Sequence, residues 1–469
     1  MIVVLDEHDS PFHLPLVDFH THIGRVKIET TKGASQRVNR PQDIINLYEK
    51  LQYEIHRRIS QDQSKYYVTL PKTEELSQPL LPVVQRLLEL NSTKGRGWIV
   101  DHIVCFPFND IFHKKTSPKF IKSNKYVRHQ TQSFDFSFRF IPFCRVDVTD
   151  EGASDEVKNS VALGMRGLKL HPMSQGWIEN IVSNNCKEVL QTAGDLSIPI
   201  IFDVPNKGVA VDITKIADEA REEVEYPINV ILGHSAFDYN SEEIFECLGK
   251  DGMFAETSGM RGKDVEIYFN NVVKVDGWEE KLLFGTDSNY FGVLQAADFI
   301  TFLLSWKFKE LVESNGSDIN PLTAAAKILG GNALRIILPS WIQNKQDPSK
   351  SRRSRSKGYL TDLSLLKSNL KKILAEENTT GTIDLAKPEN KEYSVQVLSI
   401  GQLDRKFSYI LETKDSYQKI KLSPISNLNR ISDLSIKTLN PVELVSKSWR
   451  RIPRLKEQTF LELLNGGNV

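Results

Sequence analysis

Eight short runs of apolar, β-branched and aromatic residues recur along this chain and constrain its fold more than any other feature. Amphipathic segments of helical period follow several of them, for example at Asn185–Ala193 and Ser241–Gly249. Strands that alternate with helices predict parallel βαβ units, and eight such units predict an α/β fold, the (β/α)8 TIM barrel. The runs lie at Pro15–Gly24, Trp98–Pro107, Phe138–Asp147, Met165–Pro172, Ile198–Pro205, Ile228–Ser235, Gly252–Gly259 and Lys281–Ser288.

The composition changes after the last two helices predicted for the barrel, Val293–Val312 and Pro321–Leu338. Residues 343–359 include the basic, serine-rich run Lys350–Lys357, which predicts a flexible linker; a nucleic-acid-binding arm is the less favoured alternative. We therefore predict a barrel domain over residues 1–342 and a small α+β domain over residues 360–469. In this second domain we expect helices at Leu360–Ala375 and Pro441–Arg451, and a hairpin of strands at Glu392–Ile400 and Lys406–Leu411.

The polar stretch Arg25–Gly97 separates the first two predicted strands, and we expect it to be mostly helical. Pro41 opens a segment of helical period, and a second helix is expected at Leu81–Leu90. A connection this long between two barrel strands is unusual. We therefore expect it to form a cover over the strand ends.

The charge balance does not predict a nucleic-acid or membrane partner, and we expect a small-molecule substrate. The 469 residues carry 60 Lys and Arg against 60 Asp and Glu, so the formal net charge is zero. The 4 cysteines are widely spaced and predict free thiols, not disulfides or a zinc–thiolate site. The N-terminal apolar run is too short for a signal-peptide core, and no run is long enough to span a bilayer, so a cytoplasmic location is expected.

The first predicted strand ends with His20 and His22, two residues apart. Alternate side chains of a strand share a face, so Asp18 is expected to project together with both histidines. Two imidazoles on one face of a strand end are a good start for a divalent metal site. The alternative is an exposed strand end that carries two solvated histidines.

Further ionisable residues end later strands, at the end of the barrel where this fold places its active sites. Imidazole and carboxylate groups are the ligands of a catalytic zinc or manganese ion, which lowers the pKa of a water molecule. Asp287 is suited both to bind the ion and to accept the proton of that water, and His234 to polarise the substrate or protonate its leaving group. The residues collected at the strand ends are His20, His22, Lys169, His171, Asp203, His234 and Asp287.

Five segments together resemble the amidohydrolase superfamily, and within it the amidohydrolase-related family that includes the aminocarboxymuconate-semialdehyde decarboxylase type of enzyme. The resemblance covers the predicted barrel and does not reach the C-terminal domain. It implies metal ligation by His20, His22 and Asp287, and a catalytic or substrate-orienting role for His234. The matching segments are Val17–His22, Gly167–Pro172, Ile231–Ser235, Phe284–Asp287 and Gly331–Arg335.

The fifth predicted strand departs from the family pattern, because Asp203 stands where the family usually has a histidine ligand. A carboxylate can still bind a divalent ion, so we predict Asp203 as a further metal ligand. The first alternative is that Asp203 has left the metal and that the site is weakened or lost. The second is that His171 replaces the missing ligand. The resemblance implies that Lys169 and His171 line the substrate pocket. Glu256 is assigned either to substrate binding or to a hydrogen-bonded position in the core.

These residues predict one divalent metal ion, with zinc favoured over manganese or iron. We expect a metal-dependent hydrolase that uses a metal-activated water on a C–N or C–O bond of a small molecule. As the resemblance implies, the first alternative is a non-oxidative decarboxylase or hydratase of a small carboxylic acid at the same site. The second is a catalytically degenerate barrel that serves as a scaffold or binding module. The sequence leaves a homo-oligomer open.

Overall fold

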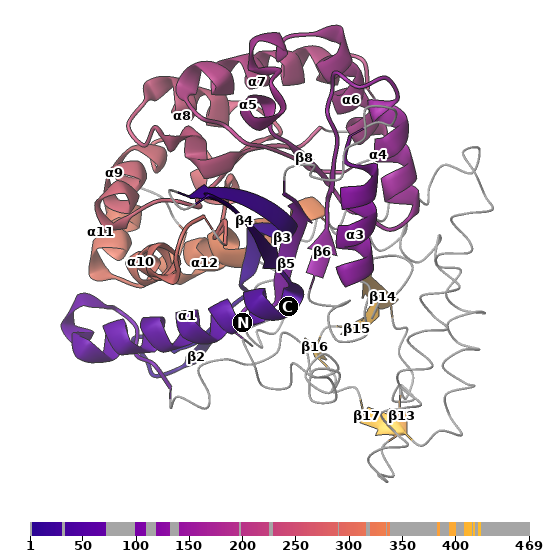
Figure 1. Ribbon diagram of the computed structural model, residues 1–469. Helices are drawn as coiled ribbons and strands as arrows, with labels where there is room; N and C mark the ends of the chain where they lie inside the picture. Colours follow the sequence, from indigo (N-terminus) through magenta and orange to yellow (C-terminus); the bar gives the residue numbers. More distant parts are fainter. Residues whose placement is uncertain are drawn as a thin grey trace.

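The computed structural model describes most of the predicted barrel and several strands of the C-terminal part (Figure 1). In the barrel, the described residues are 2–30, 33–71, 99–108, 119–131, 140–196, 198–224, 228–288, 290–315, 319–333 and 335–337. Beyond it they are 382–384, 394–399, 408–414, 416–417 and 421–423. The predicted linker and the helices expected at Leu81–Leu90, Leu360–Ala375 and Pro441–Arg451 lie outside the described residues.

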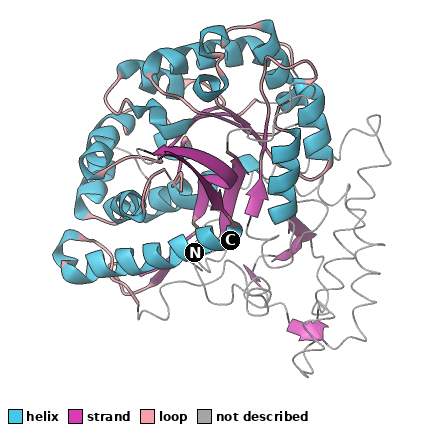
Figure 2. Ribbon diagram, in the orientation of Figure 1, coloured by secondary structure: helices cyan, strands magenta, loops and turns pink. Residues whose placement is uncertain are grey.

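Two groups of parallel strands form the centre of the barrel, and Figure 2 shows helices surrounding them. One group contains β3 (Val17–Thr30), β5 (His102–Pro107) and β6 (Phe140–Pro142). The other runs in the order β12–β11–β10–β9–β8–β7. Its strands are β7 (Cys144–Arg145), β8 (Leu168–Leu170), β9 (Ile200–Phe202), β10 (Val230–Leu232), β11 (Met253–Glu256) and β12 (Leu282–Leu283).

Backbone hydrogen bonds join the two groups at both seams. At the first seam, Phe143 lies between β6 and β7, and its N–H donates to the carbonyl of Cys105 at 2.8 Å, so β6 and β7 act as one interrupted strand. At the second seam, the N–H of Phe19 in β3 donates to the carbonyl of Phe284 just after β12 at 2.8 Å. The strands therefore close into a (β/α)8 barrel, as the alternation of strands and helices predicts.

Helices cover the outside of the barrel and bury their apolar faces (Figure 1). In α7 (Lys207–Arg221), Val209, Ile213 and Ile216 are buried at helical spacing, and the Asn206 side chain caps the helix by accepting the N–H of Val209 at 3.1 Å. The other helices are α1 (Pro41–Gln61), α3 (Ile121–Thr131), α4 (Ala153–Ala162), α5 (Pro172–Gln175), α6 (Asn184–Asp195), α8 (Glu242–Gly249), α9 (Gly262–Val272), α10 (Val293–Leu303), α11 (Trp306–Ser314) and α12 (Pro321–Ala326).

The first barrel strand runs on beyond the barrel as a hairpin. β3 extends to Thr30 and pairs antiparallel with β4 (Gly33–Asn39). The expectation of a mostly helical stretch is therefore wrong for residues 25–30 and 33–39, although α1 forms as predicted. Val26 and Ile28 alternate with charged residues, a strand pattern that the polar composition obscured. A second hairpin, of β1 (Ile2–Leu5) and β2 (Pro11–Leu14), precedes β3.

The helices after β12 differ in detail from the prediction. The segment Val293–Val312 forms two helices, because the chain breaks before Ser305, whose hydroxyl accepts the N–H of Phe308 at 3.4 Å and caps α11. α12 begins at Pro321 as predicted and continues through a π-helical turn at Lys327–Gly331.

The hairpin predicted for the C-terminal part is present. β14 (Ser394–Ser399) pairs antiparallel with β15 (Ser408–Lys414), which also pairs with β16 (Ser416–Tyr417). β13 (Thr382–Asp384) pairs antiparallel with β17 (Lys421–Ser423). The boundaries of the C-terminal domain stay a prediction.

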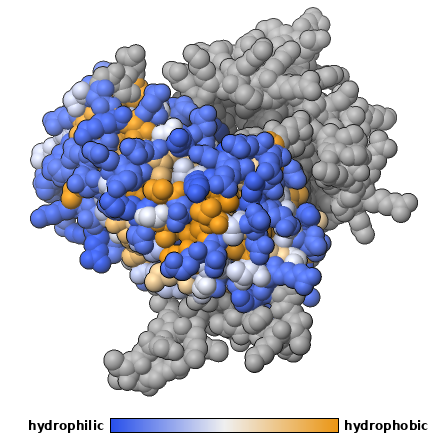
Figure 3. Space-filling model, turned by 90° about the horizontal axis from the view of Figure 1, so that it is seen from above, coloured by the Kyte–Doolittle hydropathy of each residue, from blue (hydrophilic) through white to orange (hydrophobic). Residues whose placement is uncertain are grey.

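The described surface is mainly polar on the face shown in Figure 3, with hydrophobic residues gathered near the middle of that face. A polar outer surface is typical of helices that turn their apolar faces to the core. Among the described residues, no helix combines the length and hydropathy needed to cross a bilayer.

A buried carboxylate, that of Asp18, ties the first strand of the barrel to the last strand and to α1. Its Oδ1 accepts the backbone N–H groups of His20 at 3.0 Å and Thr286 at 2.9 Å. Its Oδ2 accepts the hydroxyl groups of Thr21 at 2.7 Å, Thr286 at 2.6 Å, and Tyr48 of α1. Burial raises the pKa of Asp18 to about 6 in spite of these donors. At neutral pH the carboxylate is therefore charged and depends on them.

We expect Tyr48→Phe to destabilise the barrel, because it removes one donor from the buried Asp18 carboxylate. Loss of a hydrogen bond to a charged group costs about 1.5–3 kcal/mol. The urea midpoint of unfolding, followed by tryptophan fluorescence, measures the effect. Tyr53→Phe is the matched control on the same helix, because Tyr53 is 70% exposed. Equal midpoints for the two variants would contradict a stabilising role for the Tyr48 hydroxyl.

Candidate metal centre

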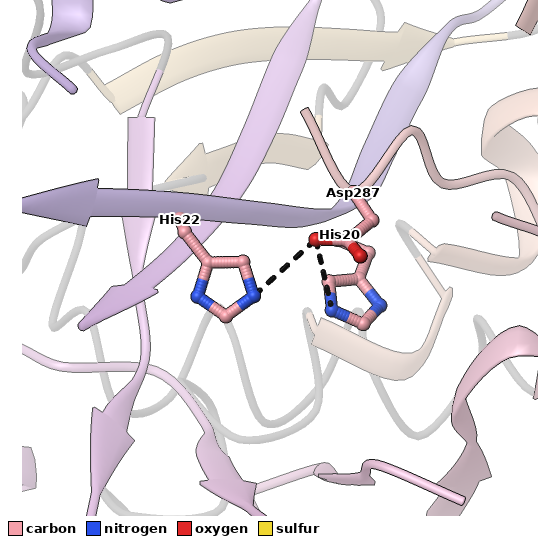
Figure 4. Close-up of side chains that lie close together, drawn as sticks. All are labelled: His20, His22 and Asp287. Carbon is pink, nitrogen blue, oxygen red and sulfur yellow. Dashed lines mark ion pairs between the residues drawn. The ribbon is translucent and has the colours of Figure 1, made fainter. Parts of the chain in front are cut away.

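His20, His22 and Asp287 come together at the carboxyl end of the barrel, across the seam between β3 and the segment after β12 (Figure 4). The Oδ1 atom of Asp287 lies 3.3 Å from Nε2 of His22 and 3.7 Å from Nε2 of His20. All three residues are buried, and we call them the ligand group. The structure thus brings together three of the residues predicted as metal ligands.

A β-bulge in β3 affects the direction of these side chains. The pairing of β3 with β5 shifts between Asp18 and Thr21, so that two residues of β3 stand opposite one residue of β5. The bulge interrupts the strand alternation on which the sequence prediction depended. Asp18 therefore does not join His20 and His22 but bonds to Thr21, Thr286 and Tyr48.

The polar atoms of the ligand group fit a divalent cation. Asp287 Oδ1 is buried and faces both imidazoles, yet it has no hydrogen-bond partner among the described residues. A buried carboxylate oxygen whose contacts with two imidazoles form no well-aligned hydrogen bond is poorly satisfied, and a cation between the three side chains would satisfy it. Two imidazoles and one carboxylate also form a three-ligand donor set of the kind found in catalytic zinc sites.

Glu256, at the end of β11, fixes the protonation of His20. Its Oε2 lies 2.8 Å from Nδ1 of His20, and a carboxylate accepts the hydrogen bond, so we assign the proton to Nδ1 and the lone pair to Nε2, which lies 3.3 Å from Nζ of Lys169. Burial lowers the pKa of His20 well below its usual range, which keeps the ring neutral. A metal-ligating histidine commonly donates its second N–H to a carboxylate in this way.

Glu256 is fully buried and acts as a positioning acid. Besides His20, its Oε2 accepts the backbone N–H of His234 at 3.1 Å, and its Oε1 accepts the backbone N–H of Ser258. Gly285 makes room for it, because a Cβ at that position would lie 2.1 Å from Oε1. Of the two alternatives that the sequence left open, these contacts favour the hydrogen-bonded core acid over the substrate contact.

A left-handed turn after β10 carries His234. The residues from His234 to Phe237 all have φ between 47° and 58°, a conformation that residues other than glycine rarely adopt. Gly233 precedes the turn, and a Cβ there would lie 2.6 Å from the carbonyl oxygen of Phe202. Strained backbone of this kind clusters at functional sites, because the surrounding structure must hold it in place.

Both ring nitrogens of His234 already have partners. Nδ1 lies 2.8 Å from the hydroxyl of Ser258, and Nε2 lies 3.2 Å from Oδ2 of Asp203. His234 also lies close enough to His20 and Glu256 to form a second group of possible ligands. In that group, however, hydrogen bonds engage Glu256 Oε2 and both nitrogens of His234. His234 is therefore better suited to proton transfer than to metal binding.

Asp203 lies outside the ligand group. Its Oδ1 is 3.4 Å from Nδ1 of His171, and its Oδ2 is 3.7 Å from Nζ of Lys169. Burial alone would raise the pKa of Asp203, but the neighbouring Lys169, His234 and His171 hold it well below its usual range. Asp203 is therefore an ionised carboxylate, and its side chain is 15% exposed. Metal ligation by Asp203 stays a prediction that its partners in the structure do not favour.

Lys169 and His171, the two polar residues of the Lys-Leu-His motif, differ in exposure. Lys169 is fully buried, with Nζ 3.3 Å from Nε2 of His20 and 4.9 Å from the centre of the Phe106 ring, and burial lowers the pKa of its amine. His171 has a side chain that is 21% exposed, and its Nδ1 accepts the N–H of Ser174 at 3.4 Å at the start of α5. Burial lowers the pKa of His171 to about 2, so this ring is neutral. Substrate contact stays a prediction for both.

Aromatic side chains that the sequence analysis did not single out surround the histidines. Phe108 stacks on His22 with ring centres 4.8 Å apart, and Phe237 stacks on His234 at 4.4 Å. Tyr290 lies 5.5 Å from the His22 ring and is 58% exposed. These rings lower the local dielectric around the polar atoms. The sequence could have indicated two of these rings, because Phe237 and Tyr290 each follow a strand-end residue of the site by three positions.

No protein-family model and no curated protein matches the chain. Similar solved structures include an uncharacterized TIM-barrel protein from Bordetella bronchiseptica, with 15% identity and a TM-score of 0.41 over 70% of this chain and 99% of that one. They also include the 5-carboxyvanillate decarboxylase LigW from Sphingomonas paucimobilis, with 12% identity and a TM-score of 0.39 over 69% and 99%. A putative amidohydrolase from Staphylococcus aureus has 14% identity and a TM-score of 0.40 over the same shares. Likeness at this level says nothing of what this chain binds or acts on.

Proposed function

We propose that the chain is a metal-dependent hydrolase of the amidohydrolase superfamily that acts on a C–N or C–O bond of a small molecule. The ligand group carries this proposal, because two buried imidazoles face a buried carboxylate oxygen that has no hydrogen-bond partner among the described residues. The group lies at the carboxyl end of a (β/α)8 barrel, where active sites of this fold are found. The motifs at the same residues resemble those of the superfamily.

We assign one divalent cation, with zinc favoured, to His20, His22 and Asp287. When bound, such an ion supplies a Lewis acid that lowers the pKa of a water molecule and polarises a substrate carbonyl. The same donors accept manganese or iron. Glu256 supports the assignment, because it places the proton of His20 on Nδ1 and the lone pair on Nε2, the nitrogen that faces Asp287 and Lys169.

We assign the proton transfers and substrate binding to side chains at the carboxyl end of the barrel. Burial alone would raise the pKa of Asp287, but the neighbouring His20 and His22 hold it below its usual range, so its carboxylate is available to accept the proton of the attacking water. His234 is placed to protonate the leaving group. Lys169 is proposed to contact the substrate.

A non-oxidative decarboxylase or hydratase is the second candidate function. Lys169 Nζ lies 3.3 Å from Nε2 of His20, and the charge of the buried Arg145 acts on His22. A buried amine and a buried guanidinium group near the ligand group suit a substrate that carries a carboxylate. The two functions use the same residues and differ in the product.

We expect the purified full chain to hold one zinc ion per chain after loading and dialysis. His22→Ala should weaken zinc binding by more than about 100-fold, because loss of an outer partner alone already costs about 10–100-fold. Competition with a chromophoric chelator measures the dissociation constant of each variant.

Asp203→Asn is the matched control for this experiment. This substitution removes a charge at the same end of the barrel but outside the ligand group. We therefore expect its dissociation constant for zinc to lie within a few-fold of that of the wild type. A loss as large as that of His22→Ala would show that Asp203 is a ligand. A wild-type chain that binds neither zinc nor manganese would contradict the proposed function and favour a scaffold or binding module.

We expect the zinc-loaded chain to hydrolyse members of a panel of cyclic amides, lactones and esters. His234→Gln should lower kcat by about 10²–10⁴-fold, the usual contribution of general acid–base catalysis, and leave the metal content unchanged. Proton release in a pH-stat and the product mass report the reaction.

Glu266→Gln is the control for activity, because Glu266 lies on α9 with a side chain that is 44% exposed and pairs with Lys307. Its kcat should equal that of the wild type. Release of carbon dioxide from small carboxylic acids, with no hydrolysis of the panel, would replace the hydrolase by the decarboxylase. Full activity of His234→Gln would remove His234 from the proposed mechanism.

A further inference from the structure

We propose that Ser258 and Asp203 are positioning residues that hold His234 in one tautomer and one orientation for proton transfer. The three side chains form a row, Ser258–His234–Asp203, which we call the His234 row. The inference rests on the proposed function for the role of His234 as a proton donor. The hydrogen bonds of the row can be tested without a substrate.

Two short contacts define the row. The Ser258 hydroxyl lies 2.8 Å from Nδ1 of His234, within ordinary hydrogen-bond distance. On the other side of the ring, Nε2 lies 3.2 Å from Oδ2 of Asp203. Three segments supply the three side chains: the ends of β9 and β10, and the turn after β11. The ring is therefore bonded from both sides by elements far apart in the sequence.

The chemistry of the partners determines where the proton of His234 lies. The Asp203 carboxylate faces nitrogen atoms of Lys169, His171 and His234 at 3.2–3.7 Å, and a carboxylate can only accept a hydrogen bond. Nε2 must therefore carry a proton, and in the neutral ring Nδ1 is then the acceptor. The Ser258 hydroxyl can donate or accept, so it donates to Nδ1. Of the two neutral tautomers of His234, only the one with the proton on Nε2 satisfies both ends of the row.

Other contacts remove the remaining freedom of His234. Its backbone N–H donates to Oε2 of Glu256 at 3.1 Å, and its ring stacks on Phe237 with an interplanar angle of 17°. The left-handed turn that begins at His234 fixes the direction of its Cα–Cβ bond. Because the ring can neither flip nor tilt without loss of a contact, the geometry points to a histidine held ready for one proton transfer.

The two ends of the row are not equivalent. Ser258 is only 1% exposed, and its backbone N–H is bound by Glu256, so it lies on the inner side of the ring. The side chain of Asp203 is 15% exposed and lies beside His171, on the outer side. Burial of Ser258 behind the histidine argues against a nucleophilic serine and for a positioning role.

The row also gives Asp203 a role that differs from metal ligation. Its position on the fifth strand is where the sequence resemblance leads one to expect a histidine ligand. In this chain the carboxylate at that position bonds to His234 and lies outside the ligand group. The departure from the family pattern therefore supplies an acceptor for the Nε2 proton.

Nitrogen-15 NMR of the full, metal-free chain, labelled at histidine, tests the row directly. His234→Gln identifies the signals of His234. At alkaline pH, where the ring is neutral, we expect a protonated Nε2 and a hydrogen-bonded, unprotonated Nδ1. A proton on Nδ1, or a mixture of both tautomers, would overturn the proposal. This measurement on the wild type stands even if a variant of Ser258 does not fold.

Three variants of the turn residues separate positioning from packing. Ser258→Ala should shift the Nδ1 signal of His234 towards that of a nitrogen without a hydrogen bond, whereas Ser258→Thr, which keeps the hydroxyl, should restore it. Ser235→Ala is the matched control, because the Ser235 hydroxyl donates to the Glu256 carbonyl at 3.2 Å and not to the ring. An unchanged Nδ1 signal in a folded Ser258→Ala chain would overturn the role of Ser258.

Kinetics complete the test once the panel has given a substrate. We expect Ser258→Ala to lower kcat by about tenfold or more through misplacement of His234, with KM and zinc content unchanged and with Ser258→Thr close to the wild type. A change in KM alone would overturn the positioning role. If no panel compound reacts, the proposed function fails, while the NMR signals still decide whether the row exists.

Discussion

The buried carboxylate of Glu256 is the interaction on which the rest of the site depends. It binds Nδ1 of His20 from β3, the backbone N–H of His234 after β10 and the backbone N–H of Ser258 after β11. In a low-dielectric interior such bonds are strong, and an unpaired carboxylate would be costly. One side chain therefore determines both the tautomer of His20 and the position of His234. Gly285 makes this arrangement possible, because the side chain of any other residue there would occupy the space of the Glu256 carboxylate.

Strained backbone on either side of this carboxylate places the reactive groups. Asp287 has a φ of 44°, and its N–H donates to the carbonyl of His20 at 2.7 Å, so the strain is held by the neighbouring strand. The left-handed turn at His234 is held in the same way by Glu256. Each residue in such a conformation costs about 1–3 kcal/mol, which only a closed and well-packed barrel can offset. The precise placement of the side chains in the site therefore depends on the rigidity of the closed barrel.

The sequence predicts the barrel well, because each strand is a compact apolar run that needs no knowledge of its partners. It also predicts that His20, His22 and Asp287 meet, since the carboxyl ends of all eight strands converge. It misses what depends on a local departure from regular geometry. The bulge in β3 redirects Asp18, and no residue type in the strand predicts the bulge. Convergence likewise places Asp203 at the mouth without telling which neighbour it bonds, and the buried Ser258 has no motif at all.

The position of the ligand group relative to the closing seam has a thermodynamic consequence. His20 and His22 belong to the first strand of the ring and Asp287 follows the last, so the donors lie on opposite sides of the join. A cation bound by all three side chains would link the first strand of the barrel to the last, although most of the barrel sequence separates them. The free energy of binding at such a link also contributes to the free energy of folding. Occupancy of the site and folding of the barrel would in this way be linked equilibria.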